Sequence, residues 1–301
     1  MAKKIKKINK SKKIKNNKGK NNKIIKKRII ESRIPQIFFN KINLQLTDIQ
    51  IKIISHVKEN ESNLNYFYRD EKNVKLNKEI IEKVKDSCLC RVSDEFGSAV
   101  CINNKGYILT CSHAAPPFEY EKSKESLYIF PNGDLVKTLT IEKDEKLDLA
   151  LLKIIEIYEN EKYFKIEKIP EKKFLYSKIK VTPKKENEKV GEKIFCIGNP
   201  CFAMYDDYGK FEKNKYKPFW VTFGKIKGYI GDAIYCKKEL GPLIHNCWTY
   251  WGHSGAPIFN KYGEIVGMHN SWNDKNGDRH GLSLLGIHKF ISKFDFLNKC
   301  K

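Results

Sequence analysis

From about residue 86 to residue 288, short apolar runs alternate with stretches of glycine, proline, asparagine and charged residues. Runs bounded by such turn residues, for example by Pro131-Asn132-Gly133, are typical of strands in an antiparallel sheet. The first group of expected strands covers residues 88–92, 99–102, 106–110, 126–130, 135–142 and 149–155. The second group covers residues 189–197, 220–229, 233–236, 257–260, 264–269 and 281–285. This pattern predicts an all-β fold of two six-stranded antiparallel β-barrels.

A helical pattern appears in two segments ahead of the first strand. Thr47 has the chemistry of an N-cap for an amphipathic run that extends to Val57, although the apolar spacing of this run also partly fits a strand. Residues 78–85 have the pattern of a short amphipathic helix that leads into the first barrel. We therefore expect residues 29–77 to form a partly helical N-terminal extension that packs on the barrels or covers part of them.

The same pattern predicts the domain organisation. A chain of 301 residues with 41% hydrophobic residues is long enough to bury the core of a double barrel. We expect this body at residues 78–295, with barrel one at about 86–156 and barrel two at about 189–288. The connecting parts are a Lys/Glu-rich inter-barrel segment at 156–188, a loop without clear strand periodicity at 201–219 and a C-terminal tail at 296–301.

Charge is concentrated at the N-terminus. Residues 1–28 contain thirteen lysines, one arginine and no acidic residue, and so contribute +14 of the net charge of +22. Such a polar, basic segment has little to bury, and we expect it to be disordered. The alternatives for its function are a nuclear-import or nucleic-acid-binding tail, a mitochondrial presequence and plain solubilising charge. Its preference for lysine and asparagine over arginine and serine argues against the presequence.

The cysteines and the absence of long apolar runs indicate the compartment. Nine cysteines, an odd number, fit reduced thiols in an intracellular protein better than a disulfide framework. The spacings around Cys88-x-Cys90 and Cys196-x4-Cys201 lack the paired CxxC of a zinc site, so we expect no metal and no cofactor. No secretory leader or membrane-spanning run is visible. We therefore expect an intracellular protein, cytoplasmic or nuclear, with a mitochondrial location left open.

The hexapeptide Gly252-His-Ser-Gly-Ala-Pro257 carries the clearest chemical signal. Two glycines flank one serine just ahead of an apolar strand pattern, which predicts a sharp turn that presents the Ser254 hydroxyl and aims backbone N–H groups at one point. A side chain at Gly252 or Gly255 would crowd that turn. An ordinary glycine-serine turn explains the hexapeptide equally well, so the remaining chain has to decide between the two interpretations.

A nucleophilic serine requires a histidine base and a carboxylate that orients it. His113 follows the apolar run Gly106-Tyr-Ile-Leu-Thr110 in a small-residue turn, and Asp148 stands at the head of the apolar run Leu149–Ile154. Asp144 is a rival carboxylate, but it lies in a polar Glu-Lys-Asp-Glu-Lys run that is typical of a turn. The chain order is thus His, Asp, Ser, and we expect His113 and Asp148 from barrel one to meet Ser254 from barrel two.

Several motifs in this order resemble the chymotrypsin-like (trypsin-fold) serine peptidases, within them the DegP/HtrA proteases. The resemblance covers about residues 78–295 and is carried by Gly97-Ser-Ala-Val, Gly106-Tyr-Ile-Leu-Thr with His113, Asp148-Leu-Ala-Leu-Leu-Lys, Val190-Gly-Glu, Ile197-Gly-Asn-Pro200, Gly252-His-Ser-Gly-Ala-Pro257 and Gly281-Leu-Ser-Leu-Leu-Gly-Ile287. It implies a chymotrypsin-like double barrel and a serine endopeptidase with the triad His113, Asp148 and Ser254. The N–H groups of Gly252 and Ser254 would form its oxyanion hole. The chain stops soon after barrel two, so we expect no C-terminal PDZ domain.

Two further details of the resemblance concern specificity and activity. Thr249 and His269 resemble the S1 residues of glutamyl endopeptidases and viral 3C-like proteases, which implies cleavage after Glu or Gln; a buried, structural histidine is the alternative. His253 departs from the Asp or Asn that the family usually has before the serine. This departure leaves a second function open: a catalytically inert protease-fold binding protein with a basic nucleic-acid-binding or nuclear-targeting tail.

The expected partners follow from these functions. They are protein or peptide substrates, with weak nucleic-acid contact through the tail and no membrane. The oligomeric state stays open.

Overall fold

The computed structural model describes residues 45–60, 66–67, 78–117, 123–159, 162–165, 173–181, 187–205, 211–213, 216–230 and 242–298. The chain divides into two compact units, residues 1–46 and Thr47–Lys301, and the fold described below belongs to the second unit. The basic tail at residues 1–28 lies outside the described residues, so its disorder and its nucleic-acid contact stay predictions.

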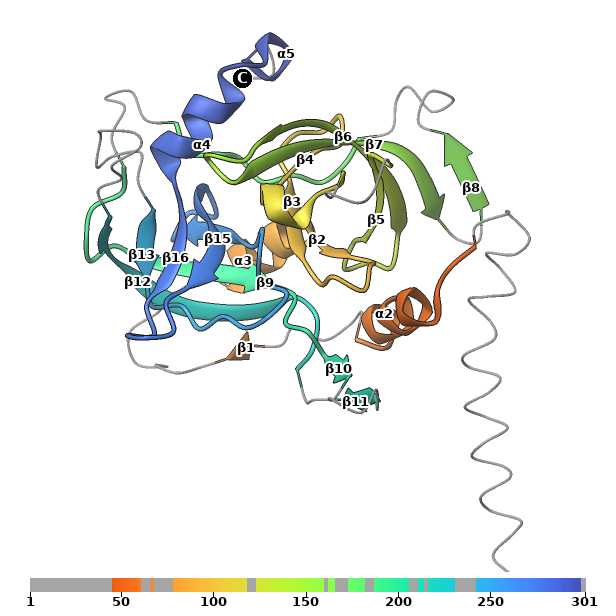
Figure 1. Ribbon diagram of the computed structural model, residues 1–301. Helices are drawn as coiled ribbons and strands as arrows, with labels where there is room; N and C mark the ends of the chain where they lie inside the picture. Colours follow the sequence, from red (N-terminus) through yellow and green to blue (C-terminus); the bar gives the residue numbers. More distant parts are fainter. Residues whose placement is uncertain are drawn as a thin grey trace, which may run out of the picture. The chain divides into compact units, whose positions relative to one another are not determined.

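The first barrel contains β2 (Cys88–Arg91), β3 (Ser98–Cys101), β4 (Tyr107–Thr110), β5 (Glu125–Ile129), β6 (Leu135–Asp144) and β7 (Leu149–Glu159). Its strands pair in the order β4-β3-β2-β5-β6-β7, and pairing of β4 with β7 closes the barrel (Figure 1). Every pairing within it is antiparallel. A short strand, β8 (Lys162–Lys165), extends the sheet beyond β7. The core is filled by alternating inward residues such as Leu89, Ile108, Tyr128 and Leu152, which are all fully buried.

The second barrel contains β9 (Lys193–Gly198), β12 (Trp220–Tyr229), β13 (Leu243–His245), β14 (Pro257–Asn260), β15 (Ile265–Trp272) and β16 (Arg279–Ser283). The order is β12-β13-β16-β15-β14-β9, and β12 pairs with β9 to close it. A two-residue strand, β1 (Tyr66–Phe67), adds to β12 in parallel. The expected fold class of two six-stranded antiparallel β-barrels is therefore confirmed, with one short extra strand on each barrel.

Some elements differ from the expectation. The predicted strand at residues 233–236 lies outside the described residues, and the strand that completes barrel two at this point is β13, whose three-residue run is too short to give a periodic signal. The loop at 201–219 contains a two-stranded hairpin, β10 (Ala203–Tyr205) with β11 (Phe211–Lys213). The chain after β16 forms the helices α4 (Leu284–Ile291) and α5 (Asp295–Asn298) rather than a continued strand.

Both helical segments expected ahead of the first strand are present. α2 (Asp48–Glu59) begins at the N-cap Thr47, whose side chain accepts a hydrogen bond from the Gln50 N–H while the Gln50 side chain accepts one from the Thr47 N–H. This reciprocal pair satisfies two donors that a helix start leaves open. The buried face of α2 consists of Ile49, Ile53, Ile54 and Val57. The second helix, α3 (Lys78–Lys85), has the bounds that its amphipathic pattern predicts.

α2 is attached to both barrels. The Gln50 side-chain amide donates to the Val92 carbonyl just after β2 at 3.3 Å. The His56 ring stacks on Phe202, which follows β9, with 4.1 Å between ring centroids. These contacts place α2 against residues of both barrels.

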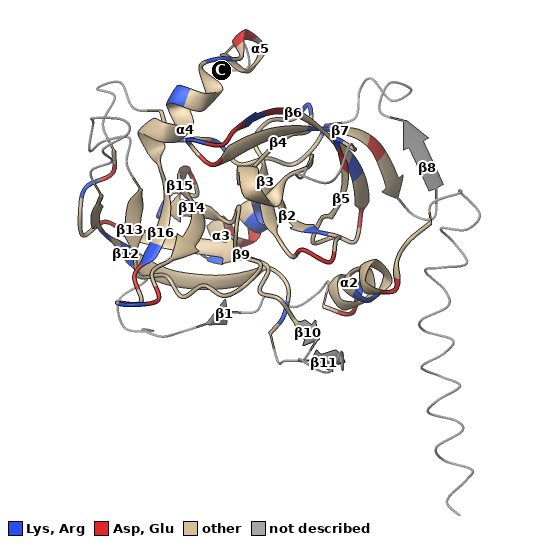
Figure 2. Ribbon diagram, in the orientation of Figure 1, with Lys and Arg blue, Asp and Glu red and all other residues tan. Residues whose placement is uncertain are grey.

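Lysines and acidic residues alternate along β6 and β7 (Figure 2), so barrel one has no single-sign face there. The seven cysteines within the described residues are buried and free. None of the helices in the described part of the chain has the length and apolar character needed to cross a lipid bilayer.

Candidate active site

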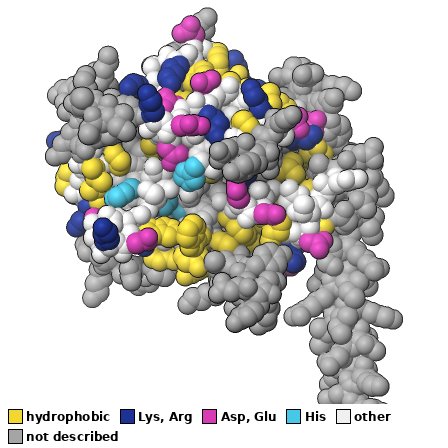
Figure 3. Space-filling model, in the orientation of Figure 1, with side chains coloured by type: hydrophobic (Ala, Val, Ile, Leu, Met, Phe, Trp, Pro, Cys, Tyr) yellow, Lys and Arg dark blue, Asp and Glu magenta, His cyan; other side chains and the backbone are white. Residues whose placement is uncertain are grey.

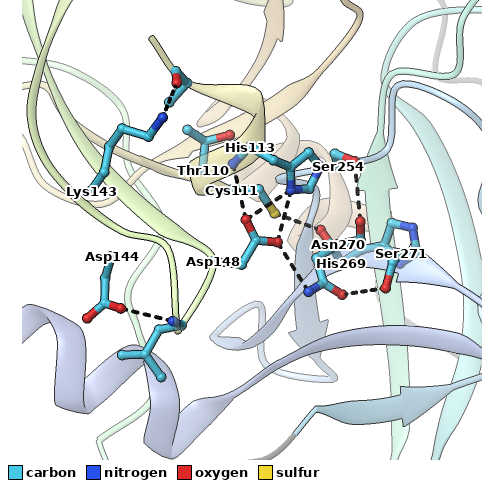
Figure 4. A network of polar contacts seen from close by, with 12 residues as sticks. Thr110, Cys111, His113, Lys143, Asp144, Asp148, Ser254, His269, Asn270 and Ser271 are labelled. Carbon is cyan, nitrogen blue, oxygen red and sulfur yellow. Dashed lines mark hydrogen bonds and ion pairs between the residues drawn. The ribbon is translucent and has the colours of Figure 1, made fainter. Parts of the chain in front are cut away.

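His113 lies on a 3-10 turn, Ser112–Ala114, that directly follows β4, and Asp148 lies one residue ahead of β7. Because β4 and β7 are neighbours in the barrel, their ends bring the two side chains together. His113 Nδ1 lies 2.9 Å from Asp148 Oδ1 and 3.0 Å from Oδ2. The backbone N–H of His113 also donates to Oδ1, at 3.1 Å (Figure 4). The carboxylate thus holds both the ring and the backbone of the histidine.

Asp148 is fixed by its own backbone and by a residue of the other barrel. Its φ of 51° lies in the left-handed region, which Asp tolerates better than most non-glycine residues. From β15, the Asn270 side-chain amide donates to Asp148 Oδ2 at 3.2 Å. Asn270 had no role in the sequence-based hypothesis, because an Asn one residue past a predicted strand end carries no signal that points across the barrels.

The rival carboxylate, Asp144, is engaged elsewhere. At the end of β6, it accepts a hydrogen bond from the Leu147 N–H at 2.9 Å and pairs with the Lys293 ammonium at 2.7 Å (Figure 4). Burial raises the pKa of Asp144, but the hydrogen bond and charge of Lys293, together with hydrogen bonds from the Leu147 and Lys146 backbone, outweigh burial and hold the pKa below its ordinary value. Of the two aspartates, Asp148 is therefore the one beside His113.

Ser254 stands in a tight loop that only glycines allow. The His253 N–H donates to the Tyr250 carbonyl at 3.0 Å, which closes a four-residue turn with Gly252 at a φ of 91°. A positive φ at this turn position strongly favours glycine. A Cβ at Gly252 would lie 2.3 Å from the Asn199 carbonyl oxygen, and one at Gly255 would lie 2.0 Å from that of Ser98. The expected lack of room at both glycines is confirmed.

The loop is tied to barrel one through Ser98, on β3. The Ser98 N–H donates to the Ser254 carbonyl at 2.8 Å, and its hydroxyl donates to the Gly252 carbonyl at 2.8 Å. The same hydroxyl accepts from the Asn199 N–H at 2.9 Å, and Asn199 bonds in turn to the backbone of both Leu89 and Phe219. Ser98 of the Gly97-Ser-Ala-Val motif and Asn199 of the Ile197-Gly-Asn-Pro motif thus hold the serine loop in place. Neither residue had a role in the sequence-based hypothesis.

Ser254 and His113 line one cavity of about 810 Å³ at the junction of the barrels. The Ser254 hydroxyl donates a long hydrogen bond, 3.4 Å, to the Asn270 carbonyl. Within the described residues, no hydrogen bond joins this hydroxyl to the His113 ring. The structure therefore brings His113 and Ser254 to a common cavity, with the serine hydroxyl turned toward β15.

The backbone N–H groups of Gly252 and Ser254 have no acceptor among the described residues. Their neighbours in the loop do have one, because the N–H groups of His253, Gly255 and Ala256 all donate to backbone carbonyls. Gly252, Ser254 and His113 line the same cavity. Two open donors beside a hydroxyl form an arrangement that could accept a negatively charged oxygen.

His253, the residue that departs from the family pattern, is fully buried behind this loop. Its Nδ1 lies 3.1 Å from both the N and the O of Tyr250, and its ring packs so closely on Gly198 that a Cβ there would lie 2.3 Å from it. Burial lowers the pKa of His253 to about 3, so the imidazole is neutral near pH 7. The side chain thus supports the serine loop by packing rather than by charge.

Thr249 and His269, the predicted S1 residues, are both buried, with exposed fractions of 2% and 1%. They do not line the cavity shared by Ser254 and His113. His269 Nδ1 lies 3.1 Å from His245 Nε2, and burial, followed by the charges of His245 and His253, lowers the pKa of His269 well below its ordinary value. The Thr249 hydroxyl has no hydrogen-bond partner within the described residues.

One group of side chains has metal-ligand chemistry. The donor atoms of Cys111, His113 and Asp148 lie within 4.8 Å of one another. Burial raises the pKa of the Cys111 thiol well above its ordinary value, and the thiol donates to the His269 carbonyl at 3.3 Å. A protonated thiol and a His–Asp pair that already bond each other fit a proton-holding site better than a metal site.

Comparison with known proteins identifies the family of this chain. A family model described as "Trypsin-like peptidase domain" matches residues 97–268, more than half of the chain. No curated protein matches the sequence. Among solved structures, the chain is similar to the serine endoprotease from Yersinia pestis, with 19% sequence identity and a TM-score of 0.49; the match covers 71% of this chain and 64%, less than two thirds, of that one. The chain belongs to the family of trypsin-like peptidase domains.

Proposed function

We propose that this peptidase is a serine endopeptidase in which His113, Asp148 and Ser254 form the catalytic triad. The observation that carries the proposal is the two-point contact of His113 with Asp148 at the cavity that Ser254 also lines. A histidine held by a carboxylate at Nδ1 keeps its other nitrogen, Nε2, as the proton acceptor. The substrates of this family are proteins or peptides.

In the proposed reaction, Ser254 Oγ attacks the carbonyl carbon of the scissile peptide bond while His113 Nε2 takes the hydroxyl proton. This step requires the Ser254 hydroxyl to turn from the Asn270 carbonyl, a bond of 3.4 Å that is weak at this length. Collapse of the tetrahedral intermediate breaks the C–N bond, and His113 gives its proton to the leaving amine. Water then hydrolyses the acyl-enzyme with His113 again as base.

The N–H groups of Gly252 and Ser254 stabilise the oxyanion of both tetrahedral intermediates. Each donor of this kind contributes roughly 3 kcal/mol to transition-state stabilisation. The turn from Tyr250 to His253 and the hydrogen bond from the Ser98 hydroxyl to the Gly252 carbonyl hold the Gly252 peptide in place before substrate binds. The oxyanion hole is thus preorganised by groups in both barrels.

We propose further that the enzyme cleaves after Glu or Gln. The support is the buried Thr249 hydroxyl, which lacks a hydrogen-bond partner among the described residues, and the neutral His269, whose Nδ1 is engaged by His245. A side chain with a carboxylate or amide oxygen at the P1 position, the residue just before the scissile bond, would provide an acceptor for both.

The test of the proposal is cleavage of a peptide library with all residues varied at P1, by wild type and by Ser254→Ala, His113→Ala and Asp148→Asn. We expect hydrolysis by wild type, with a loss of about three to six orders of magnitude in kcat for each variant. Unchanged turnover in Ser254→Ala would contradict the triad. Preference for Arg or for small aliphatic residues at P1 would overturn the Glu/Gln specificity but not the peptidase.

A further inference from the structure

The cavity beside Ser254 has a wall that the barrels do not provide. Besides Gly252, Ser254, His113 and Ala114, it is lined by Thr47, Asp48 and Ile49 at the start of α2, by residues 94–96 of the β2–β3 loop, and by Arg91, Cys201 and Trp251. The first turn of α2 is therefore part of the cleft that holds the proposed nucleophile.

This wall is fixed in place by aromatic packing. Phe202 stacks on His56 of α2 and meets Phe96 edge-on, with 5.9 Å between the ring centroids of the two phenylalanines. Phe96 in turn lies against the oxyanion loop, since a Cβ built on Gly252 would be 3.1 Å from Phe96 Cβ. A continuous line of packed rings thus joins α2 to the site of reaction.

The cavity lies on the leaving-group side of Ser254. No residue of β15 lines it, although the Asn270 carbonyl of β15 is the acceptor of the Ser254 hydroxyl. Its walls instead include His113, the group that must protonate the departing amine, and the adjacent Ala114. The residues of a substrate that follow the scissile bond, termed P1′ and P2′, would therefore enter it.

The charge of the cavity is acidic. Its acidic and basic lining side chains are three carboxylates, Asp48, Asp94 and Glu95, together with Arg91 and His113. Arg91 is 4% exposed and pairs with Glu95 at 3.3 Å, which neutralises one carboxylate. Asp48 and Asp94 are exposed and have no ion pair with another described residue. Figure 2 shows acidic residues on α2 and on the loop after β2.

Apolar surface adjoins these carboxylates. Ile49, Phe96 and Trp251 line the same cavity, and the Trp251 side chain is 59% exposed. On the face drawn in Figure 3, hydrophobic side chains gather beside the histidines, and acidic side chains lie next to that patch. An apolar floor with carboxylates at its rim matches the long methylene chain and charged end of Lys or Arg.

We infer that the N-terminal helix and the β2–β3 loop form a binding site for a basic side chain at P1′ or P2′ of the substrate, with Asp48 and Asp94 as specificity-determining residues. The inference rests on the proposed function, and it assigns the N-terminal extension a role in substrate choice. An exposed ion pair gives a few-fold preference, so two carboxylates acting together predict roughly a tenfold preference for Lys over Glu.

The test compares kcat/KM for peptides with one fixed P1 residue and Lys, Gln or Glu at P1′ and P2′. In wild type we expect the order Lys, Gln, Glu, with about tenfold between the first and the last. In the double variant Asp48→Asn, Asp94→Asn, the ratio of the Lys peptide to the Glu peptide should fall below about threefold. Asp295→Asn, an exposed carboxylate on α5 outside the cavity, is the matched control. Equal ratios in wild type and the double variant would overturn the inference.

A second measurement separates this inference from the peptidase itself. Fluorescence anisotropy of the same labelled peptides on Ser254→Ala reports binding without turnover. If the Lys peptide binds more tightly than the Glu peptide, and adding Asp48→Asn and Asp94→Asn removes this difference, the site is supported. If the wild type at the same time cleaves no peptide, only the proposed function fails. Equal binding of the Lys and Glu peptides contradicts the site even if cleavage is normal.

Discussion

At the residue scale, the candidate site depends on hydrogen bonds that position its side chains. Asn270 donates to Asp148, which holds His113, and the Asn270 carbonyl accepts from Ser254. Asn270 thus contacts the carboxylate and the proposed nucleophile without being placed to react. We regard it as a positioning residue that keeps the Asp148 carboxylate aligned with the imidazole.

Asn270→Ala should lower kcat roughly tenfold or more and leave KM nearly unchanged, because the lost bond goes to a charged group. Asn270→Ser, which retains a donor, should recover part of the loss. Kinetics across pH provide the specific readout: the pH profile of kcat/KM should shift in Asn270→Ala. If kcat and its pH profile match those of wild type, Asn270 has no positioning role.

The buried histidines give a second effect at this scale. Burial lowers the folded-state pKa of His245 and His253 to about 3, against an ordinary value of 6.5. Both rings fold as neutral groups, so their contribution to stability is complete above about pH 6.5 and is lost as the pH falls toward 3. Each histidine contributes a slope of about 1.4 kcal/mol per pH unit in that range.

We therefore expect the free energy of unfolding to fall steeply below pH 6.5. His253→Asn introduces the residue type usual in the family. In this variant the free energy of unfolding should fall less steeply with decreasing pH, by about 1.4 kcal/mol per pH unit, because one buried histidine no longer titrates. Urea unfolding between pH 4 and pH 8 measures the free energy of unfolding of the wild type and of His253→Asn. Identical slopes would show that His253 is not held neutral.

At the scale of elements, the hydrophobic pattern predicted most strands and the two helical segments ahead of the first barrel correctly. The bounds of α3 and of β12 agree with the bounds that their patterns predict. The three-residue β13 was missed because too few residues alternate to give a period. His113, Asp148 and Ser254 could be proposed from the sequence because each stands next to or just ahead of an apolar run, whereas Ser98, Asn199 and Asn270 act through contacts between segments far apart in the chain.

α2 illustrates how an element outside the barrels is fixed by burial. Ile53 is 1% exposed on the inner face of this helix. Ile53→Ala should lower the free energy of unfolding by about 3 kcal/mol, because it removes buried methyl groups and leaves a cavity. Lys58→Ala, at an exposed position of the same helix, is the control. Urea denaturation measures the free energy of unfolding of both variants. Equal losses in Ile53→Ala and Lys58→Ala would mean that α2 does not pack as described.

At the scale of the whole molecule, the two barrels share one hydrogen-bonded junction. Ser98 in barrel one bonds to the backbone of Gly252 and Ser254, and its hydroxyl satisfies the Asn199 N–H from the loop after β9. The reactive loop of barrel two is therefore shaped by a residue of barrel one. Neither barrel alone would hold the proposed oxyanion hole in this geometry.

Ser98→Ala should cost about 1–3 kcal/mol of stability, because it leaves the buried Gly252 carbonyl and Asn199 N–H without their partner. It should also reduce kcat of the folded enzyme, because the Gly252 peptide of the oxyanion hole loses the hydrogen bond that holds it in place. Ser126→Ala, a serine on β5 of the same barrel away from the junction, is the matched control. Equal kcat values for the two variants would contradict a catalytic role of the junction.

The central claim is that Ser254 is a nucleophile activated by His113. A fluorophosphonate probe reacts covalently only with an activated serine hydroxyl, and peptide mass spectrometry locates the adduct. We predict a single adduct on Ser254 in the wild-type protein and none in Ser254→Ala, with labelling in His113→Ala slowed by several orders of magnitude. A folded wild-type protein that the probe leaves unlabelled, or one labelled equally fast without His113, would contradict the account.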